Sequence, residues 1–233
     1  MTGEPIAADD RGLSYGDGLF ETMRVVAGRV PLWHQHRARL LAGAGRLGIA
    51  VTAARIDAAL TPVLAGVGDG IIKIVVTRGR GGRGYSVPAE VMPTLLVQAY
   101  PLRTPPPRCY EQGLLIGLCD IRLASQPLLA GIKHLNRLEQ VMARRQVDQA
   151  GWDEGLMLGS AGEPLELTAM NLFARFGDTL WTADLSQAGV AGVMRGYVIE
   201  QLADSHGLVL RVASGTLSQL QLADEVFACN SVA

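Results

Sequence analysis

One stretch of the chain decides how its fold is divided, and it reads Pro101-Leu-Arg-Thr-Pro-Pro-Pro-Arg108. Proline lacks an amide proton and has a fixed φ angle. Three successive prolines therefore exclude both a helix and a central strand, and they favour an extended polyproline segment. We predict a linker over residues 101–108, which separates a small N-terminal domain, residues 1–100, from a larger C-terminal domain, residues 109–233.

Helices and strands are mixed on both sides of this linker. Before it, apolar spacing predicts strands over 19–26, 71–77 and 91–99, and helices over 33–47 and 53–64. After it, the same patterns predict strands over 113–118, 154–158, 171–176 and 179–182, and helices over 134–149 and 193–203. We expect antiparallel hairpins rather than a regular βαβ series, so the fold class is α+β.

The composition limits the classes of function. Of the 233 residues, 48% are hydrophobic and 18% are charged, which supplies enough apolar surface for packed cores and excludes a disordered chain. The formal net charge is −1. Without a broad basic field the chain is not expected to bind nucleic acid, although local arginines could hold a small anion.

Three features of the sequence bear on cellular location and on metal binding: the N-terminus, the cysteines and the histidines. Residues 1–10 lack the basic and apolar regions of a secretory signal, and no apolar run reaches the roughly 18 residues that span a bilayer. The three cysteines have no CxxC spacing, and the four histidines have no metal-ligand spacing. We therefore expect a cytoplasmic protein with no membrane partner, disulfide framework or metal site.

Lysine is rare in this chain. Of 21 basic residues only two are lysines, Lys73 and Lys133. Arginine cannot replace lysine as an amine nucleophile, because its guanidinium stays protonated. Lys133 lies just before a predicted helix with apolar neighbours, where loss of hydration favours a free amine that can bond to an aldehyde. A lysine that merely extends from a helix terminus fits the pattern equally well. Lys73 lies in mid-strand and is expected to face solvent.

Two further segments could bind a cofactor with a basic ring nitrogen and a phosphate. Glu166 lies between leucines, far from other charges, and could pair with the ring nitrogen; an exposed glutamate on a hairpin is the alternative. Residues 187–195 form a glycine-containing loop that opens a helix, and such helix starts bind anions. Arg39 could add a positive charge, or it could be a solvated helix residue.

The segment Arg78-Gly-Arg-Gly-Gly-Arg-Gly-Tyr85 follows a predicted strand. This cationic, glycine-rich loop is suited to the carboxylates of a small anionic substrate, and Arg83 could bind one in bidentate fashion. A flexible solvated hairpin and an RNA-binding tract are the alternatives, and the acidic net charge disfavours RNA.

Five segments of the sequence together resemble a known family. In chain order they are Asp10-Arg-Gly-Leu-Ser-Tyr-Gly-Asp-Gly-Leu-Phe-Glu-Thr22, His36-Arg-Ala-Arg-Leu40, Lys133-His-Leu-Asn-Arg137, Glu166 through Asn171-Leu-Phe173, and Gly192-Val-Met-Arg195. The chain resembles the fold-type IV enzymes that depend on pyridoxal 5'-phosphate (PLP), which include branched-chain and D-amino-acid aminotransferases. Residues 78–86 and 130–140 are most similar to those of the aminodeoxychorismate lyases within that class.

The resemblance implies a role for each matching residue. Lys133 would be the catalytic lysine that bonds to PLP. The other cofactor-binding positions would be Glu166 at the ring nitrogen and, around the phosphate, Arg39, the amides of Val193 and Met194, Asn230 and Ser231. Substrate would be contacted by Arg83, Tyr85 and Thr22. The family also implies a homodimer and a two-domain fold, with a small α/β domain and a larger pseudo-barrel-like domain.

The implied reaction converts 4-amino-4-deoxychorismate to 4-aminobenzoate and pyruvate in folate biosynthesis. A branched-chain or D-amino-acid aminotransferase of the same fold is the alternative, followed by a ligand-binding protein without activity.

Relatives are expected to continue past Cys229-Asn-Ser-Val-Ala233 by a strand and a helix, so that the C-terminal end of this chain is truncated.

Overall fold

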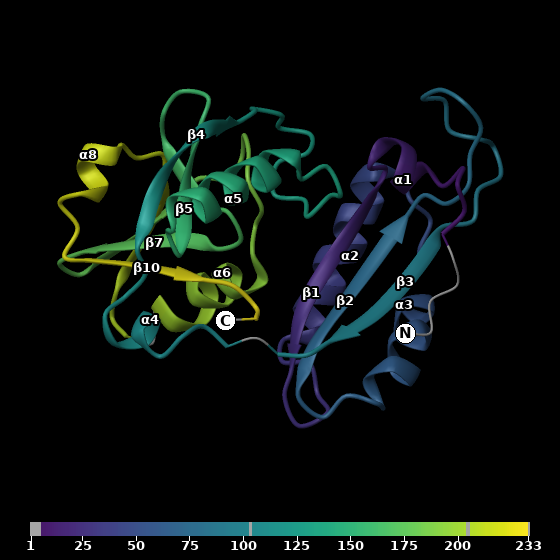
Figure 1. Ribbon diagram of the computed structural model, residues 1–233, viewed down its shortest axis with the longest axis horizontal. Coiled ribbons are helices and arrows are strands. Elements are labelled where there is room, and N and C mark those ends of the chain that lie inside the picture. Colours follow the sequence, from purple (N-terminus) through teal and green to yellow (C-terminus); the bar gives the residue numbers. More distant parts are fainter. Residues whose placement is uncertain (1–5, 103, 204–205, 233) are drawn as a thin grey trace. The chain divides into compact units, whose positions relative to one another are not determined.

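The computed structural model describes residues 6–102, 104–203 and 206–232, which divide into two compact units (Figure 1). The first unit holds residues up to 102 together with Ile132–Asn136 and Val232, and the second holds residues 104–131 and 137–231. The segment that carries Lys133 thus groups with the first unit, although it follows the linker in sequence. Four parts of the predicted regions lie outside the described residues: the first five positions, Arg103 of the linker, residues 204–205 and Ala233.

The first unit contains a three-stranded antiparallel sheet with the order β1-β2-β3 among the described residues. Its elements are α1 (Arg11–Tyr15), β1 (Gly18–Val25), α2 (Trp33–Leu47), α3 (Ala53–Leu64), β2 (Gly70–Thr77) and β3 (Thr94–Tyr100). The two longer helices match the predicted ranges, and Figure 1 shows both on the same side of the sheet.

Alternation along the strands gives this sheet two different faces. One face is covered by α2 and α3 and forms a core from apolar side chains on all these elements: Leu19, Met23, Val25, Leu40, Ala44, Ile56, Leu60, Ile72, Ile74 and Val76. Residues at the intervening positions, such as Phe20, Thr22 and Lys73, are half-buried and belong to the opposite face. We call this second side the open face of the first sheet.

Residues 132–136 run along β1 as an extended segment. The amide of Phe20 donates to the carbonyl of Lys133 at 3.0 Å, and the amide of Leu135 donates to the carbonyl of Gly18 at 3.0 Å. Ile132 is buried in the core of the first unit. The predicted helix over 134–149 therefore begins only at Leu138, because the preceding residues use their backbone groups to pair with a strand.

The second unit contains a larger sheet. Its described strands have the order β4-β5-β6-β7-β8-β9, with β10 paired to β7. Its elements are α4 (Arg108–Glu111), β4 (Ile116–Leu123), α5 (Leu138–Ala150), β5 (Glu154–Gly159), β6 (Pro164–Leu167), β7 (Asn171–Phe176), β8 (Thr179–Ala183), α6 (Val193–Tyr197), the π-helical turn η1 (Val198–Leu202), β9 (Val209–Ala213), α8 (Leu217–Leu220) and β10 (Glu225–Cys229).

Two strand pairs of this sheet differ from the predicted hairpins. β4 pairs with β5 in parallel, and β8 pairs with β9 in parallel. A parallel pair needs a crossover connection. α5 supplies the first crossover, and α6 with η1 supplies the second. The mixed α+β class agrees with the prediction, but the sheet is not built of hairpins alone. None of the helices in the described ranges is long and apolar enough to cross a membrane.

A substitution at Gly18 would test how closely residues 132–136 pack on β1. A Cβ atom at this position would lie 2.5 Å from the carbonyl oxygen of Val76 and 2.8 Å from a methyl group of Leu135. We expect Gly18→Ala to lower the free energy of unfolding by about 1–3 kcal/mol in denaturant titrations, because the β2 backbone that carries the Val76 carbonyl cannot move away freely.

The matched control is Gly45→Ala in α2, where a Cβ atom would meet nothing within 4 Å. This change should raise the free energy of unfolding by about 0.5–1 kcal/mol, because alanine loses less backbone entropy than glycine in a helix. Equal stabilities for the two variants would contradict the close packing at Gly18.

Candidate functional site

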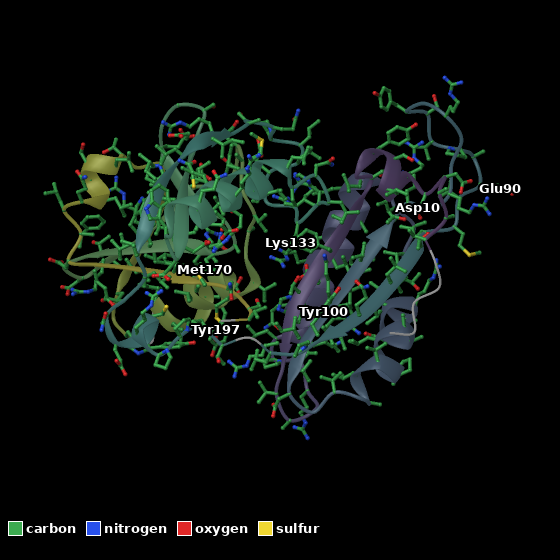
Figure 2. All side chains as sticks on the ribbon, viewed as in Figure 1. Asp10, Glu90, Tyr100, Lys133, Met170 and Tyr197 are labelled. Carbon is green, nitrogen blue, oxygen red and sulfur yellow. The ribbon has the colours of Figure 1, made fainter. Side chains whose placement is uncertain are left out.

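Lys133, labelled in Figure 2, belongs to the first unit. Its side chain lies against the ring of Phe20. Its Nζ atom is 4.4 Å from the centroid of the Phe20 ring, and the residue is half-buried. The backbone of Lys133 is fixed by its hydrogen bond from Phe20. Pairing with β1 therefore fixes the backbone position of Lys133, one of the two lysines in the chain.

Lys73 shares this environment, which differs from the prediction that it faces solvent. Its Nζ atom lies 5.2 Å from the centroid of the same Phe20 ring, and its side chain is half-buried. In the sheet, Lys73 is directly opposite Thr22, a predicted substrate-binding residue. The structure therefore brings Thr22, Phe20 and both lysines together on or beside the open face of the first sheet.

Arg39 is held in place by a buried carboxylate. Its Nε atom donates to Oε1 of Glu21 at 2.8 Å, and its Nη2 atom donates to Oε2. The Nδ1 atom of His36 lies 2.7 Å from the same carboxylate. Burial raises the pKa of Glu21, but the hydrogen bonds from His36 and Arg39 outweigh it and hold the pKa below its ordinary value of 4.5. Glu21, which the sequence analysis did not single out, thus orients the predicted phosphate-binding arginine.

Glu166 in β6 is a buried carboxylate of the second unit, with 4% of its surface exposed. The amide of Val190 donates to its Oε2 atom at 2.8 Å, and Nε2 of Gln140 donates to its Oε1 atom at 3.3 Å. The loop of Val190 is tied in turn to Gly131, whose amide donates to the carbonyl of Gly189. Glu166 is therefore fixed in direction, as a partner for a ring nitrogen must be.

The start of α6 also has the features of an anion site. Gly192 caps this helix with extended backbone, and within the described structure no side chain accepts from its first amides, which include those of Val193 and Met194. A Cβ atom at Gly192 would lie 2.0 Å from Oδ1 of Asn171. The side-chain amide of Asn171 donates to the carbonyl of Val190 at 2.8 Å. Close packing thus joins the helix start to the loop that binds Glu166.

Asn230 and Ser231 follow β10 in the same unit. The side-chain amide of Asn230 donates to the carbonyl of Ala169 at 3.3 Å, and both residues are half-buried. Burial raises the pKa of the adjacent Cys229 thiol to about 11, so that it stays protonated at neutral pH and is not a nucleophile.

The loop with Arg83 and Tyr85 is exposed at its tip, but its backbone is held by a buried arginine. Arg11 donates from Nη1 to the carbonyls of Gly84 and Ser86, at 3.1 and 3.2 Å, and from Nη2 to the carbonyl of Tyr85 at 3.1 Å. Tyr85 is 86% exposed, and Arg83 is exposed as well. The structure thus presents both predicted substrate-binding side chains outward from a fixed backbone.

Arg11 is itself positioned by Asp17. The Nε atom of Arg11 donates to Oδ2 of Asp17 at 3.0 Å, and Arg78 donates to both oxygens of the same carboxylate. Burial raises the pKa of Asp17, but the hydrogen bonds from Arg78 and Arg11 hold it below its ordinary value of 3.8. Arg11 and Asp17 both belong to the motif of residues 10–22. The motif was visible in the sequence, but the hydrogen-bond partners of its residues could not be predicted from it.

The predicted site residues fall into two groups. The first unit holds Lys133, Thr22, Arg39, Arg83 and Tyr85. The second unit holds Glu166, Val193, Met194, Asn230 and Ser231. Gln140 belongs to the second group but was not predicted. Its Oε1 atom is buried and has no hydrogen-bond partner within the described chain, while its Nε2 atom reaches Glu166. An unsatisfied polar atom beside a fixed carboxylate fits a polar ligand such as PLP.

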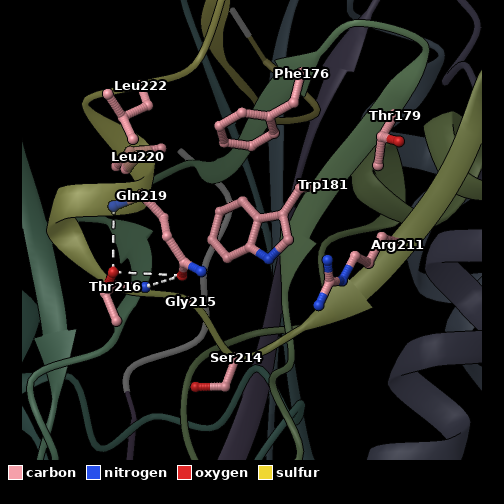
Figure 3. Close-up of a pocket in the computed structure, with 10 residues that line it drawn as sticks. All are labelled: Phe176, Thr179, Trp181, Arg211, Ser214, Gly215, Thr216, Gln219, Leu220 and Leu222. Carbon is pink, nitrogen blue, oxygen red and sulfur yellow. Dashed lines mark hydrogen bonds between the residues drawn. The ribbon is translucent and has the colours of Figure 1, made fainter.

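A separate cavity of about 300 Å³ lies between β8, β9 and α8 of the second unit (Figure 3). Trp181 and Phe176 form one side of it, with Arg211, Gln219 and Leu222 around them. The described residues that line this cavity include none of the predicted site residues, so we do not assign it to the cofactor.

Comparison with known protein families assigns the chain to one class of protein. The profile of the amino-transferase class IV family matches residues 18–233. The chain belongs to this family, whose members depend on PLP. Its fold is that of the fold-type IV enzymes, as in the branched-chain aminotransferase of Escherichia coli, which has a TM-score of 0.86 at 21% identity and covers 98% of this chain and 78% of that one.

Among individual relatives, the chain is similar to two aminodeoxychorismate lyases. It is 38% identical over 225 residues to that of Vibrio harveyi, covering 96% of this chain and 82% of the relative. It is 45% identical to the structure of 4-amino-4-deoxychorismate lyase from Pseudomonas aeruginosa, with a TM-score of 0.94 and coverage of 98% of this chain and 84% of that one. A D-alanine aminotransferase of Bacillus licheniformis is 27% identical over 97% of this chain and 79% of the relative.

The lowered pKa of Glu21 should make the stability of the protein depend on pH. We expect Glu21→Gln to lower the free energy of unfolding at neutral pH by about 3–5 kcal/mol, because Arg39 then keeps a poorly compensated charge. Since the folded-state pKa of Glu21 is lowered, its contribution is complete above its ordinary pKa of 4.5 and is lost as pH falls through the folded-state value. Denaturant titrations should therefore show the difference from wild type shrinking below that pH.

Asp57→Asn is the control for this measurement. It breaks the ion pair between Arg37 and Asp57, which is partly exposed, and should cost about 1 kcal/mol or less. A Glu21→Gln effect as small as this one, or one that does not change with pH, would contradict the role given to Glu21.

The hydrogen bonds of Arg11 should keep the loop of residues 78–86 ordered. We expect Arg11→Met to speed tryptic cleavage after Arg83 roughly tenfold or more, because the hydrogen bonds to three consecutive carbonyls are lost. Arg29→Met, at an exposed position in the turn after β1, should leave the cleavage rate unchanged. Unaltered cleavage in Arg11→Met would show that the loop is held by other contacts.

Proposed function

We propose that this chain is a PLP-dependent lyase that converts 4-amino-4-deoxychorismate to 4-aminobenzoate and pyruvate, a step of folate biosynthesis. The observation that carries the proposal is the similarity to aminodeoxychorismate lyases over nearly the whole chain. Lys133, whose backbone is fixed in the first unit, and the Glu166 carboxylate of the second unit would supply the two groups that PLP chemistry needs.

We further propose that Lys133 and Glu166 act on the same cofactor. Gly131, two residues before Lys133, is hydrogen-bonded to the loop whose Val190 amide binds Glu166. Lys133 would bond to PLP through its amine, and Glu166 would keep the ring nitrogen protonated. Arg39 would bind the phosphate together with the amides of Val193 and Met194, with Asn230 and Ser231 beside them. When bound, PLP supplies the electron sink for the carbon that loses a proton.

The Lys133 amine would move the proton in the central step. It would accept the proton from the substrate carbon that bears nitrogen, and the electron pair of that C–H bond would then be available for elimination. The bond between the neighbouring carbon and the enolpyruvyl oxygen breaks, the oxygen leaves with the bonding electrons, and the ring becomes aromatic. The leaving oxygen takes up a proton from Lys133 or from the hydroxyl of Thr22 or Tyr85.

The loop of Arg83 would bind a carboxylate of this anionic substrate. Its backbone is fixed by Arg11, while the side chains of Arg83 and Tyr85 point into solvent within one chain. A site that uses them would be completed by a second copy, which supports a homodimer.

The described cysteines, Cys109, Cys119 and Cys229, are unpaired, which supports the reducing environment of the cytoplasm.

An aminotransferase remains the second candidate, because D-alanine aminotransferases are also relatives of this chain. In that reaction Lys133 would return the proton to the cofactor carbon, and a keto acid would leave. The cationic loop disfavours this reading for branched-chain amino acids, because an aliphatic side chain does not need arginine. A protein that binds ligands without activity would bind no PLP.

Product analysis decides between these candidates. We expect the PLP-loaded protein to release equal amounts of 4-aminobenzoate and pyruvate from 4-amino-4-deoxychorismate, measured by chromatography. Exchange of D-alanine or of branched-chain amino acids with keto acids should be slower. The Lys133→Ala variant should lose at least roughly 10²-fold in kcat, because positioned proton transfer is removed.

Lys133→Arg is the matched control, since it keeps the charge but not the amine nucleophile, and it should be as inactive as Lys133→Ala. Rapid keto-acid exchange without 4-aminobenzoate would favour the aminotransferase. A protein that stays colourless after PLP addition, with no change on borohydride treatment, would favour a binding protein.

A further inference from the structure

Gln140 occupies a position on α5 where an apolar side chain would be expected. It precedes Ala143 by three positions and Val147 by seven, and both of these residues are buried in the core of the second unit. The three residues share one face of the helix, because 3.6 residues make one turn. A polar residue therefore lies on the inward stripe of α5, and such departures from the apolar pattern are expected where a polar side chain has a task.

The side-chain amide of Gln140 is turned toward Glu166. Its Nε2 atom donates to Oε1 of Glu166 at 3.3 Å. Its own Oε1 atom is buried and has no hydrogen-bond partner within the described part of the chain. The opposite orientation of the amide would bring this oxygen against the Glu166 carboxylate, and two acceptors repel each other. The donor is thus directed at Glu166 even though the amide oxygen is left unsatisfied.

Glu166 is held at both of its oxygens. The backbone amide of Val190 donates to Oε2 at 2.8 Å, the oxygen that Gln140 does not contact. Gly189 packs so closely that a Cβ atom there would lie 3.1 Å from the same Oε2 atom. Both contacts are donations, which an ionised carboxylate can accept on each oxygen. Of these two donors, only the one from Gln140 belongs to a side chain.

We propose that Gln140 is a positioning residue, which acts on the ring nitrogen of PLP through Glu166. This inference rests on the proposed role of Glu166 and deepens it. By holding Oε1, Gln140 keeps the carboxylate from rotating away from the cofactor. A carboxylate fixed in this way keeps the ring nitrogen protonated without reorganising as charge develops on the ring.

The test compares PLP with an analogue that has a C–H group in place of the ring nitrogen, so that Glu166 has nothing to pair with. Titration of the full chain, freed of cofactor, gives Kd for each compound by equilibrium dialysis. Gln140→Met removes the amide at nearly the same side-chain length, and it should raise Kd for PLP roughly three- to tenfold, the effect of one hydrogen bond. Kd for the analogue should change less than about twofold, because no contact made through Glu166 is lost.

Turnover and a second variant give further readouts. In PLP-loaded Gln140→Met, kcat for 4-aminobenzoate formation should fall roughly tenfold while KM changes less than about threefold, because Glu166 acts on the cofactor and not on substrate binding. Gln140→Glu keeps the length of the side chain, but an ionised carboxylate cannot donate and repels Glu166. This variant should therefore bind PLP more weakly than Gln140→Met.

Gln146→Met is the matched control on the same helix. Nε2 of Gln146 also donates to a carboxylate, Oδ2 of Asp120, at 3.1 Å, but Asp120 is exposed and is not a predicted site residue. The substitution removes the same kind of contact from α5. It should leave kcat and both Kd values unchanged.

The outcomes separate the inference from the proposed function. An equal rise in Kd for PLP and for the analogue would show a merely structural role for Gln140 and overturn the inference, as would unchanged Kd values in Gln140→Met. Gln140→Glu carries the same comparison if Gln140→Met does not fold. Equal affinities of wild type for PLP and the analogue would refute the role of Glu166 and the inference with it. Absence of 4-aminobenzoate formation in wild type would refute only the proposed reaction, since a selective rise in Kd for PLP still supports the role of Gln140.

Discussion

The pairing of residues 132–136 with β1 is the contact on which the rest of the site depends. Two backbone hydrogen bonds, between Phe20 and Lys133 and between Leu135 and Gly18, attach this segment to the first sheet. Ile132 anchors it in the core of that unit. A nucleophile on a long flexible side chain is useful only when its backbone is fixed. Strand pairing provides this fixation at the cost of the first turn of the expected helix.

The two units contribute different kinds of group to the proposed chemistry. In this proposal the first unit supplies cations and the amine. Its arginines Arg11, Arg39 and Arg78 are oriented by two carboxylates that the reaction does not use, those of Asp17 and Glu21. The second unit supplies a buried carboxylate, Glu166, and backbone amides at the start of α6. Fixed donors and acceptors of this kind need little reorganisation when a charged ligand binds.

The sequence predicted the long helices of the first unit, α2 and α3, because apolar spacing is a local signal. It could not predict that residues 134–137 pair or turn rather than form helix, since this depends on a strand more than a hundred positions away. The contacts of Arg11, Gln140 and Lys73 were missed for the same reason. The loop carbonyls that Arg11 binds, the Glu166 partner of Gln140 and the cross-strand neighbours of Lys73 lie 25 or more positions away, and only the fold brings them together.

The central claim is that Lys133 bonds to PLP, and the composition of the chain makes this claim easy to test. Borohydride reduction of the PLP-loaded protein makes the bond between lysine and cofactor permanent, and peptide mass spectrometry then locates it. With only Lys73 and Lys133 in the chain, two lysine-containing peptides decide the outcome. The account predicts a stoichiometric adduct on Lys133 and none on Lys73. An adduct on Lys73, or none at all, would contradict it.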